Sequence, residues 1–143
     1  MMQWKLALFS GALTPETAAL AWSGALGMIH LLVVAHFQRL QYELRWVASS
    51  RDEPRPPLAG VGGRLERAFR NYLETYPFFL AFIVAAVLTH RTNAWTAWGA
   101  FTYVWGRIIY VPLYTSGIPL IRSLFWNVAA FGSLAVLVGL ILG

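Results

Sequence analysis

Two stretches of the chain carry no formal charge over lengths sufficient to cross a membrane. Thr17 to Gln38 and Ser123 to Gly143 contain no Asp, Glu, Lys or Arg. About 20 consecutive apolar residues cross the hydrocarbon core of a bilayer as a helix. Of the 143 residues, 58% are hydrophobic and 12% are charged, against about 25% charged in a typical soluble protein. The sequence therefore predicts an all-α integral membrane protein and excludes a disordered chain or an ordinary cytosolic enzyme.

Two further apolar segments lie between these stretches, which predicts a single domain built as a bundle of four transmembrane helices. Thr14 suits the N-cap of the first helix, Pro15 its first position, and Glu16 its dipole. Beyond the membrane, Arg39 and Glu43 are four residues apart and are expected to pair on the same helix. The expected helices cover 14–46, 63–89, 94–114 and 118–142, with a loop rich in Pro, Gly and charge at 48–62.

Arginine is distributed unevenly along a chain whose net charge is +5. Most arginines flank the first loop, whereas the opposite side offers Lys5 and Arg91. Because Lys and Arg collect in cytoplasmic loops, we expect the first and third connections in the cytoplasm and both termini outside, in a periplasm or lumen. The residues before Thr14, with Trp4 among them, are expected to form an interfacial lead-in rather than a signal peptide.

Several classes of function find no support in the sequence. No basic run is interleaved with aromatic residues, so nucleic acid is not an expected partner. The chain has no cysteine, which excludes disulfides, thiolate metal sites and a cysteine nucleophile. Any thiol chemistry must then use a thiol supplied by a substrate. His30, His36 and His90 lack supporting ligands at suitable spacing, so no metal site is expected.

Ionisable residues within the spans are the most informative, because each is costly unless it is paired or faces water. On the second helix, Arg67, Asn71 and Glu74 lie at i, i+4 and i+7, hence on one face, and Arg70 precedes Glu74 by four. A self-neutralising Arg–Glu pair with a snorkelling arginine explains part of this pattern. Four polar groups exceed what neutralisation needs, which favours a zwitterionic ligand.

The third helix carries a second polar stripe, in which Arg107, Tyr110 and Tyr114 lie at i, i+3 and i+7. Pro112 lies between them and frees the carbonyl of Ile108. A kink with interfacial tyrosines would explain Tyr114. It would not explain an arginine on the same face.

The fourth helix is expected to place Arg122 and Ser123 in its first turn, after Pro119. Unpaired N–H groups and the positive end of the helix dipole favour an anion at such a terminus. A guanidinium beside them makes an anion site at the membrane edge. Anchoring of Arg122 to lipid headgroups is the alternative.

Three motifs together resemble the MAPEG family, the membrane-associated proteins in eicosanoid and glutathione metabolism, and we expect a bacterial-type member. They are the run from Arg67 to Glu74 with Pro77-Phe78, the run Arg107-Ile108-Ile109-Tyr110 with Tyr114, and Ile121-Arg122-Ser123. The resemblance extends from SSRDEP in the first loop onward and includes the four-span plan. Each motif is weak alone, and their combination is fairly specific.

The resemblance implies a homotrimer of left-handed four-helix bundles that binds glutathione, as co-substrate, in clefts between subunits. Tyr110 and Tyr114 match tyrosines of that cleft. Arg122 matches the arginine beside the thiol in the leukotriene C4 and prostaglandin E synthases, and Ser123 follows it as in the latter. The residues that match positions holding the charged ends of glutathione are Arg67, Arg70, Asn71 and Glu74.

In one respect the chain departs from the pattern of the family. Family enzymes also use an arginine at the cytoplasmic end of the first helix, where this chain offers more than one candidate. Arg39 and Arg45 are the candidates, with Gln38 and Gln41 nearby. The family also includes a non-catalytic member that binds lipid and a partner enzyme, so the fold alone does not settle activity.

The charges suggest a transferase or peroxidase mechanism. Arg122, the dipole of the fourth helix and Ser123 would stabilise the thiolate of glutathione. Arg107, Tyr110 and Tyr114 would bind the peptide, and a lipophilic electrophile or peroxide would enter from the bilayer. The competing hypothesis is a non-catalytic membrane scaffold or lipid-binding protein whose buried Arg and Glu join helices. A small transporter has less support, because four spans show no internal repeat.

Overall fold

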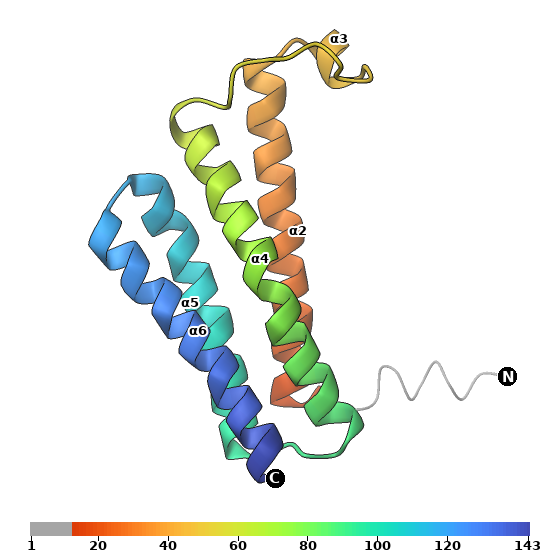
Figure 1. Ribbon diagram of the computed structural model, residues 1–143, viewed down its shortest axis with the longest axis vertical. Coiled ribbons are helices and arrows are strands. Elements are labelled where there is room, and N and C mark those ends of the chain that lie inside the picture. Colours follow the sequence, from red (N-terminus) through yellow and green to blue (C-terminus); the bar gives the residue numbers. More distant parts are fainter. Residues whose placement is uncertain (1–12) are drawn as a thin grey trace, which may run out of the picture.

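The computed structural model describes residues 13–143, and the expectation for the segment around Trp4 lies outside them. The described residues form helices and no strand. The long helices run side by side in alternating directions, and α3 lies beyond the C-terminal end of α2 (Figure 1). The elements are α2 (Pro15–Gln41), α3 (Leu44–Val47), α4 (Gly60–Leu88), α5 (Ala94–Ser116) and α6 (Pro119–Leu142).

The start of α2 agrees with the sequence, but its end does not. The side chain of Thr14 accepts a hydrogen bond from the N–H of Thr17 at 3.3 Å, with Pro15 opening the helix. The helix stops at Gln41 instead of continuing to about residue 46, since Tyr42 and Glu43 adopt extended backbone. The expected pairing of Arg39 with Glu43 is therefore wrong, because Glu43 lies beyond the helix. Within residues 13–143 the structure forms one ion pair, between Arg55 and Glu53 in the loop.

The loop after α2 folds back on the helix end, which explains the break. The hydroxyl of Tyr42 donates to the carbonyl of Pro56, and the indole N–H of Trp46 donates to that of Glu53. The side-chain NH₂ of Gln41 donates to the carbonyl of Pro57, and its side-chain oxygen accepts from the backbone N–H of Ala59. These hydrogen bonds stabilise the end of α2 at Gln41. Helix α4 follows the loop directly and begins at Gly60, three residues earlier than expected.

Helices α5 and α6, which carry most of the candidate site residues, pack closely against each other. A Cβ placed on Gly132 of α6 would lie 2.6 Å from the backbone nitrogen of Tyr103 and 2.8 Å from the carbonyl oxygen of Gly99. Only glycine at this position allows the two backbones to approach so closely. The turn between the helices is equally tight, because Gly117 ends α5 with φ +81°. The C-terminal end of α5 therefore meets the N-terminal end of α6.

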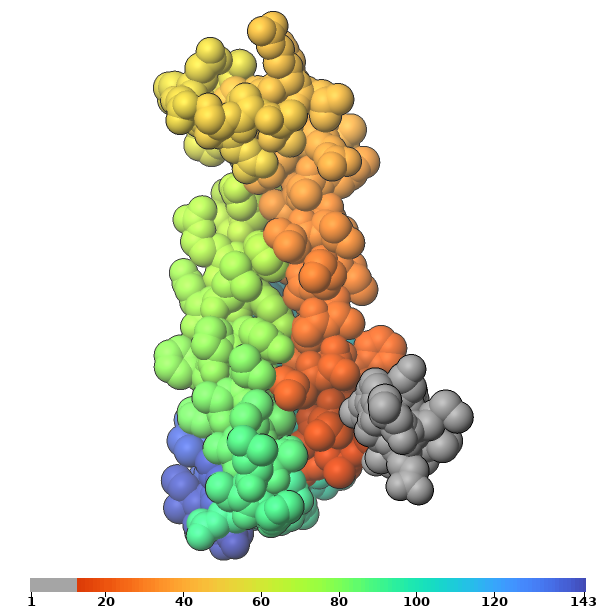
Figure 2. Space-filling view, turned by 90° about the vertical axis from the view of Figure 1, so that its right-hand side faces the viewer, coloured from red at the N-terminus to blue at the C-terminus, as the bar shows by residue number. Residues whose placement is uncertain are grey.

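The described helices present the surface of an integral membrane protein. Three of them, α2, α4 and α6, are long and apolar enough to cross a bilayer. Helix α5 has 23 residues, but its Trp, Tyr and Arg content makes it less apolar. Large apolar side chains such as Trp22, Leu32 and Phe131 are exposed. Figure 2 shows the elongated shape, with α2 and α4 side by side and the 42–59 segment gathered at one end.

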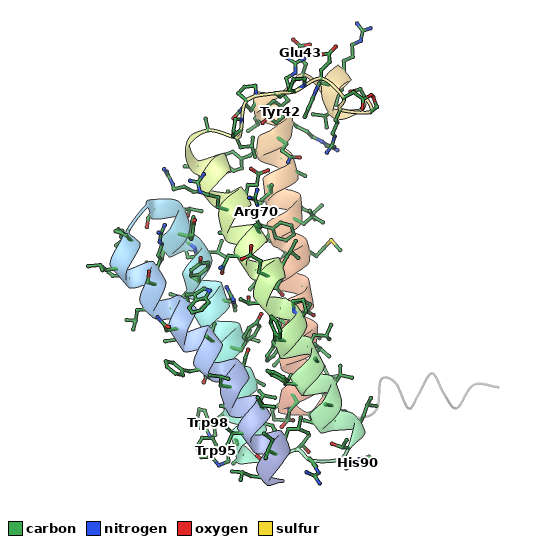
Figure 3. All side chains as sticks on the ribbon, in the orientation of Figure 1. Tyr42, Glu43, Arg70, His90, Trp95 and Trp98 are labelled. Atoms are coloured by element: carbon green, nitrogen blue, oxygen red, sulfur yellow. The ribbon has the colours of Figure 1, made fainter. Side chains whose placement is uncertain are left out.

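The two ends of the bundle differ in chemistry. Tyr42 and Glu43 mark the end that carries the loop, whereas Trp95, Trp98 and His90 lie at the opposite end (Figure 3). The 117–118 turn lies at the same end of the bundle as the 42–59 loop. The first and third connections between the long helices therefore face the same side. Trp95 and Trp98 are exposed, as expected for residues at a membrane interface.

Candidate functional site

One cavity collects five of the predicted site residues, which come from three helices. It has a volume of about 260 Å³ and opens beside the junction of α5 and α6. We call it the polar cavity. It is lined by Asn71 of α4, Tyr110 and Tyr114 of α5, and Arg122, Ser123, Trp126 and Asn127 of α6. Each of the three polar stripes predicted from the sequence therefore contributes at least one residue to this cavity.

Arg122 supplies the positive charge of this cavity. Its side chain is half-buried, and its guanidinium carbon lies 4.7 Å from the centroid of the Tyr114 ring. No carboxylate within the described chain pairs with it. The N-terminus of α6 has no side-chain cap, so its first N–H groups add their partial positive charge. An unpaired guanidinium and an uncapped helix end together favour an anion.

Ser123 presents an acceptor rather than a donor to the cavity. Its hydroxyl donates to the carbonyl of Pro119 at 3.0 Å, which commits the only proton of that group. Asn127 in turn donates to the backbone carbonyl of Ser123 at 2.9 Å. Sequence reasoning missed Trp126 and Asn127. The signal was available, since they follow Arg122 and Ser123 by four residues, one turn further along the same face.

Asn71 faces the cavity with a defined orientation. Its side-chain oxygen accepts a hydrogen bond from Nη1 of Arg107 at 3.0 Å. A guanidinium has donors and no acceptor, so the amide oxygen must be the atom that faces Arg107. The amide NH₂ has no partner among the described residues and is left for a ligand in the cavity.

Arg107 does not line the polar cavity but lines a neighbouring cavity that is mainly apolar. Its side chain is 1% exposed, although we predicted it in one stripe with the two cavity tyrosines. Its second terminal nitrogen, Nη2, donates to the hydroxyl of Thr75, a contact that sequence reasoning also missed. The guanidinium carbon lies 5.5–6.0 Å from the ring centroids of Tyr72, Tyr103 and Tyr110. Arg107 is therefore an interior residue in contact with the site.

The remaining predicted residues lie outside the cavity of a single chain. Arg67, Arg70 and Glu74 are exposed on α4, and Figure 3 shows Arg70 on the half of that helix nearer the loop. None of them forms an ion pair with another residue that the structure describes. The self-neutralising Arg–Glu pair considered from the sequence is therefore absent from residues 13–143, and all three charges remain open to a ligand or a second chain.

A second, apolar cavity adjoins the polar one. Its volume is about 310 Å³, and its wall includes Phe78, Phe82 and Leu134, with Arg107 and Thr75 as polar members. Trp126 lines both cavities and forms the partition between them. A charged ligand and an apolar ligand would accordingly lie on opposite sides of the same indole ring.

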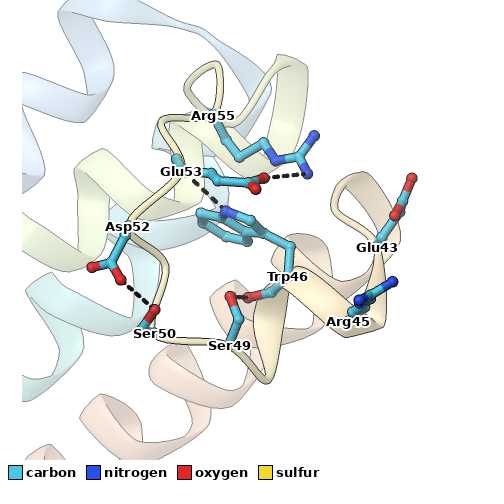
Figure 4. Close-up of a pocket in the computed structure, with 8 residues that line it drawn as sticks. All are labelled: Glu43, Arg45, Trp46, Ser49, Ser50, Asp52, Glu53 and Arg55. Atoms are coloured by element: carbon cyan, nitrogen blue, oxygen red, sulfur yellow. Dashed lines mark hydrogen bonds and ion pairs between the residues drawn. The ribbon is translucent and has the colours of Figure 1, made fainter.

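A larger cavity of about 520 Å³ lies in the 43–55 loop (Figure 4). Its acidic and basic side chains partly satisfy one another, since Arg55 and Glu53 form an ion pair at 3.6 Å and Ser50 donates to Asp52. Arg45, one candidate for the missing first-helix arginine, lines this cavity instead of the polar one. We favour the smaller polar cavity, because it gathers unpaired donors at the end of a helix dipole.

No group of three His, Asp or Glu residues in the described part of the chain could hold a metal ion. The polar cavity gathers a guanidinium, two phenols and two side-chain amides, and an apolar cavity adjoins it. The model of the MAPEG family matches residues 18–143 of the chain, nearly its whole length.

The chain belongs to the MAPEG family. No curated protein and no solved structure matched it. Family membership indicates a membrane protein of glutathione or eicosanoid metabolism. From the motifs that carried the sequence resemblance of this MAPEG chain, Asn71, Tyr110, Tyr114, Arg122 and Ser123 line the polar cavity.

Proposed function

We propose that this MAPEG protein is a glutathione-dependent membrane enzyme that activates the glutathione thiol as a thiolate. It would conjugate glutathione to a lipophilic electrophile or use it to reduce a lipophilic peroxide. The observation that carries the proposal is the polar cavity, in which the amide of Asn71, the phenols of Tyr110 and Tyr114 and the guanidinium of Arg122 converge without a carboxylate.

The proposed chemistry at Arg122 follows from charge. A free thiol has a pKa of about 8.5 and is only a few per cent ionised at neutral pH, while the thiolate is the nucleophile. A fixed guanidinium and an uncapped helix N-terminus both stabilise the anion. Lowering the thiol pKa by two units would take about 2.7 kcal/mol and would leave bound glutathione mostly ionised at pH 7.

Ser123 has a smaller role in this proposal. While its proton is donated to Pro119, its oxygen can accept the S–H of the incoming thiol but cannot stabilise the thiolate. It would need to rotate away from Pro119 to donate to the sulfur. Arg122 is therefore the catalytic residue of the proposal, and Ser123 assists by binding the neutral thiol.

The charged ends of glutathione would bind along α4. Glutathione carries two carboxylates and one amine, and the exposed side chains of Arg67, Arg70 and Glu74 match these charges in kind. Unpaired charges on a lipid-facing helix are costly, so we propose that a neighbouring copy of the chain covers this face, as in a homotrimer. Arg39 is exposed near the end of α2 and is our candidate for the arginine that this copy supplies.

The apolar cavity would hold the lipophilic co-substrate. Its position behind Trp126 places an apolar molecule next to the sulfur site. In conjugation the thiol proton passes to water, and the thiolate sulfur forms a bond to the electrophilic carbon of the substrate. The electron pair of the bond broken at that carbon leaves with a departing group or, in addition to an epoxide or an activated double bond, takes up a proton from water. In peroxide reduction two glutathione molecules supply two electrons, so that the peroxide yields an alcohol and water and the thiols yield a disulfide.

The proposed orientation follows the distribution of arginine. We propose that α5 is the fourth span, that the 42–59 and 117–118 connections face the cytoplasm, and that both termini lie outside. Seven arginines from Arg39 to Arg70 lie on or near the first connection, whereas the described residues of the opposite end carry Arg91. This distribution is typical of the cytoplasmic side of a membrane protein.

A non-catalytic scaffold remains the competing proposal, and the interior contacts of Arg107 favour it, because they join α4 and α5 without any ligand. A glutathione titration of the purified protein separates the two. The enzyme proposal predicts saturable binding and thermal stabilisation by glutathione. An unchanged unfolding temperature at millimolar glutathione would refute the enzyme proposal and support the scaffold.

A further inference from the structure

Arg107 is the largest fully buried side chain of the described chain, at 1% exposure. It retains its positive charge because an arginine does not deprotonate in a protein. No carboxylate of residues 13–143 lies within ion-pair distance of it. A buried cation without a counterion costs free energy, and Nε of Arg107 has no hydrogen-bond partner among the described residues. The groups around its two terminal nitrogens must therefore offset that cost.

The partners of Arg107 are all neutral acceptors or aromatic faces. Nη1 donates to the amide oxygen of Asn71 at 3.0 Å, and Nη2 donates to the hydroxyl of Thr75. That hydroxyl lies 3.0 Å from the carbonyl of Asn71 and 3.2 Å from that of Tyr72. Its single proton is thus donated to the backbone, and its lone pair faces Arg107. Three tyrosine rings within 6.0 Å offset part of the charge.

The consequence of this arrangement lies at Asn71. The amide oxygen is bound to Arg107, and the residue lines the polar cavity. Its NH₂ group is therefore the end available to a ligand. If the amide were free to rotate by half a turn, it would present an acceptor to an anion as often as a donor.

We propose that Arg107 is a positioning residue that fixes the amide of Asn71 with its NH₂ toward the polar cavity, so that this wall donates to an anionic part of glutathione. This role rests on the proposed glutathione-binding function. It assigns to Arg107 an action through Asn71, in place of the direct contact with glutathione expected from the sequence. Its unneutralised charge next to the cavity acts in the same direction, because it favours a bound anion.

The substitution Asn71→Asp tests the proposal with a change of one atom. The new carboxylate supplies Arg107 with a counterion, so the unfolding temperature in detergent should be unchanged or raised. The same change replaces the NH₂ donor with a negatively charged acceptor. Glutathione affinity, measured by calorimetry, should fall by about tenfold or more, as for loss of a charge-assisted hydrogen bond.

Thr75→Val is the matched control on the same helix. It removes the other acceptor of Arg107 and leaves the bond to Asn71 in place. We expect a lower unfolding temperature and unchanged glutathione affinity. Equal losses of affinity in Asn71→Asp and Thr75→Val would overturn the positioning role and show that the network only supports the fold.

A second pair of variants keeps the test independent of position 71. Arg107→Met cannot donate to Asn71, whereas the ammonium of Arg107→Lys can. We expect glutathione affinity to be lost in the first variant and partly restored in the second. Unchanged affinity in both folded variants, or in Asn71→Asp, would refute the proposal. Absence of glutathione binding by the wild-type protein would instead refute the proposed function, while a raised unfolding temperature of Asn71→Asp would still report the missing counterion.

Discussion

The guanidinium carbon of Arg122 lies 4.7 Å from the centroid of the Tyr114 ring. A residue near the C-terminal end of α5 thus contacts the cation near the N-terminal end of α6. A cation over an aromatic face gains about 0.5–1 kcal/mol at an exposed site and more where water is excluded. The contact keeps the guanidinium beside the polar cavity instead of leaving it free to extend toward lipid headgroups.

Tyr114 variants test whether this ring positions Arg122. We expect Tyr114→Leu to lower kcat/KM for glutathione conjugation by about tenfold, because loss of the aromatic face releases the guanidinium. Tyr114→Phe retains the face and should keep most of the activity. Equal losses in the two variants would assign the effect to the phenol hydroxyl, against the cation–π account.

Ser123→Ala tests the assignment of Arg122, rather than Ser123, as the catalytic residue. The hydroxyl proton of Ser123 is donated to Pro119 at 3.0 Å, so its removal costs a local hydrogen bond of about 1 kcal/mol and no thiolate contact. Steady-state kinetics should show a decrease of less than tenfold in kcat. A loss as large as that of an Arg122→Leu variant would place the serine at the sulfur.

Glu74→Gln tests the proposed binding of the glutathione amine on α4. Glu74 is exposed and has no ion-pair partner among the described residues, so we expect unchanged thermal stability. Binding of glutathione should weaken by about tenfold, the worth of one charge-assisted bond. An analogue that lacks the amine should bind wild type and variant alike, and weaker binding of that analogue to the variant would contradict the assignment.

Gly132→Ala tests the close packing that sets α6 against α5. Its new Cβ would lie 2.6 Å from a backbone nitrogen, which cannot move aside. We expect destabilisation by about 1–3 kcal/mol, as for other overpacked cores. Gly24→Ala is the control, because its Cβ would meet its nearest neighbour, the Tyr76 hydroxyl, at 3.8 Å. Equal unfolding temperatures of the two variants in the same detergent would contradict this packing.

Much of the fold follows from the sequence because its signals are local. The cap at Thr14, the start of α6 at Pro119 and the membrane-length apolar segments each depend on a few neighbouring residues. The break after Gln41 could not be predicted, since it depends on hydrogen bonds to Pro56 and Pro57. Those contacts become visible only when the loop has folded back.

The candidate site likewise includes residues whose positions follow from local spacing and one whose position depends on contacts between helices. Helical spacing placed Tyr110 and Tyr114 on one face and Arg122 with Ser123 in one turn, and the structure brings all four to the polar cavity. Spacing could not show that Arg107, on the same stripe, points between α4 and α5. That outcome depends on Thr75, whose hydroxyl provides an acceptor across the helix interface.

The state of the bound thiol tests the central claim most directly. Ultraviolet difference absorbance reports the glutathione thiolate as glutathione is titrated into purified protein at several pH values. The account predicts a saturable thiolate signal in the wild type that rises with pH and reaches half of its maximum about two pH units below free glutathione, whose thiol pKa is about 8.5. Arg122→Leu should lose this signal while its oligomer stays intact. A thiolate signal of equal size in Arg122→Leu, or saturable binding of glutathione to the wild type without any thiolate, would contradict it.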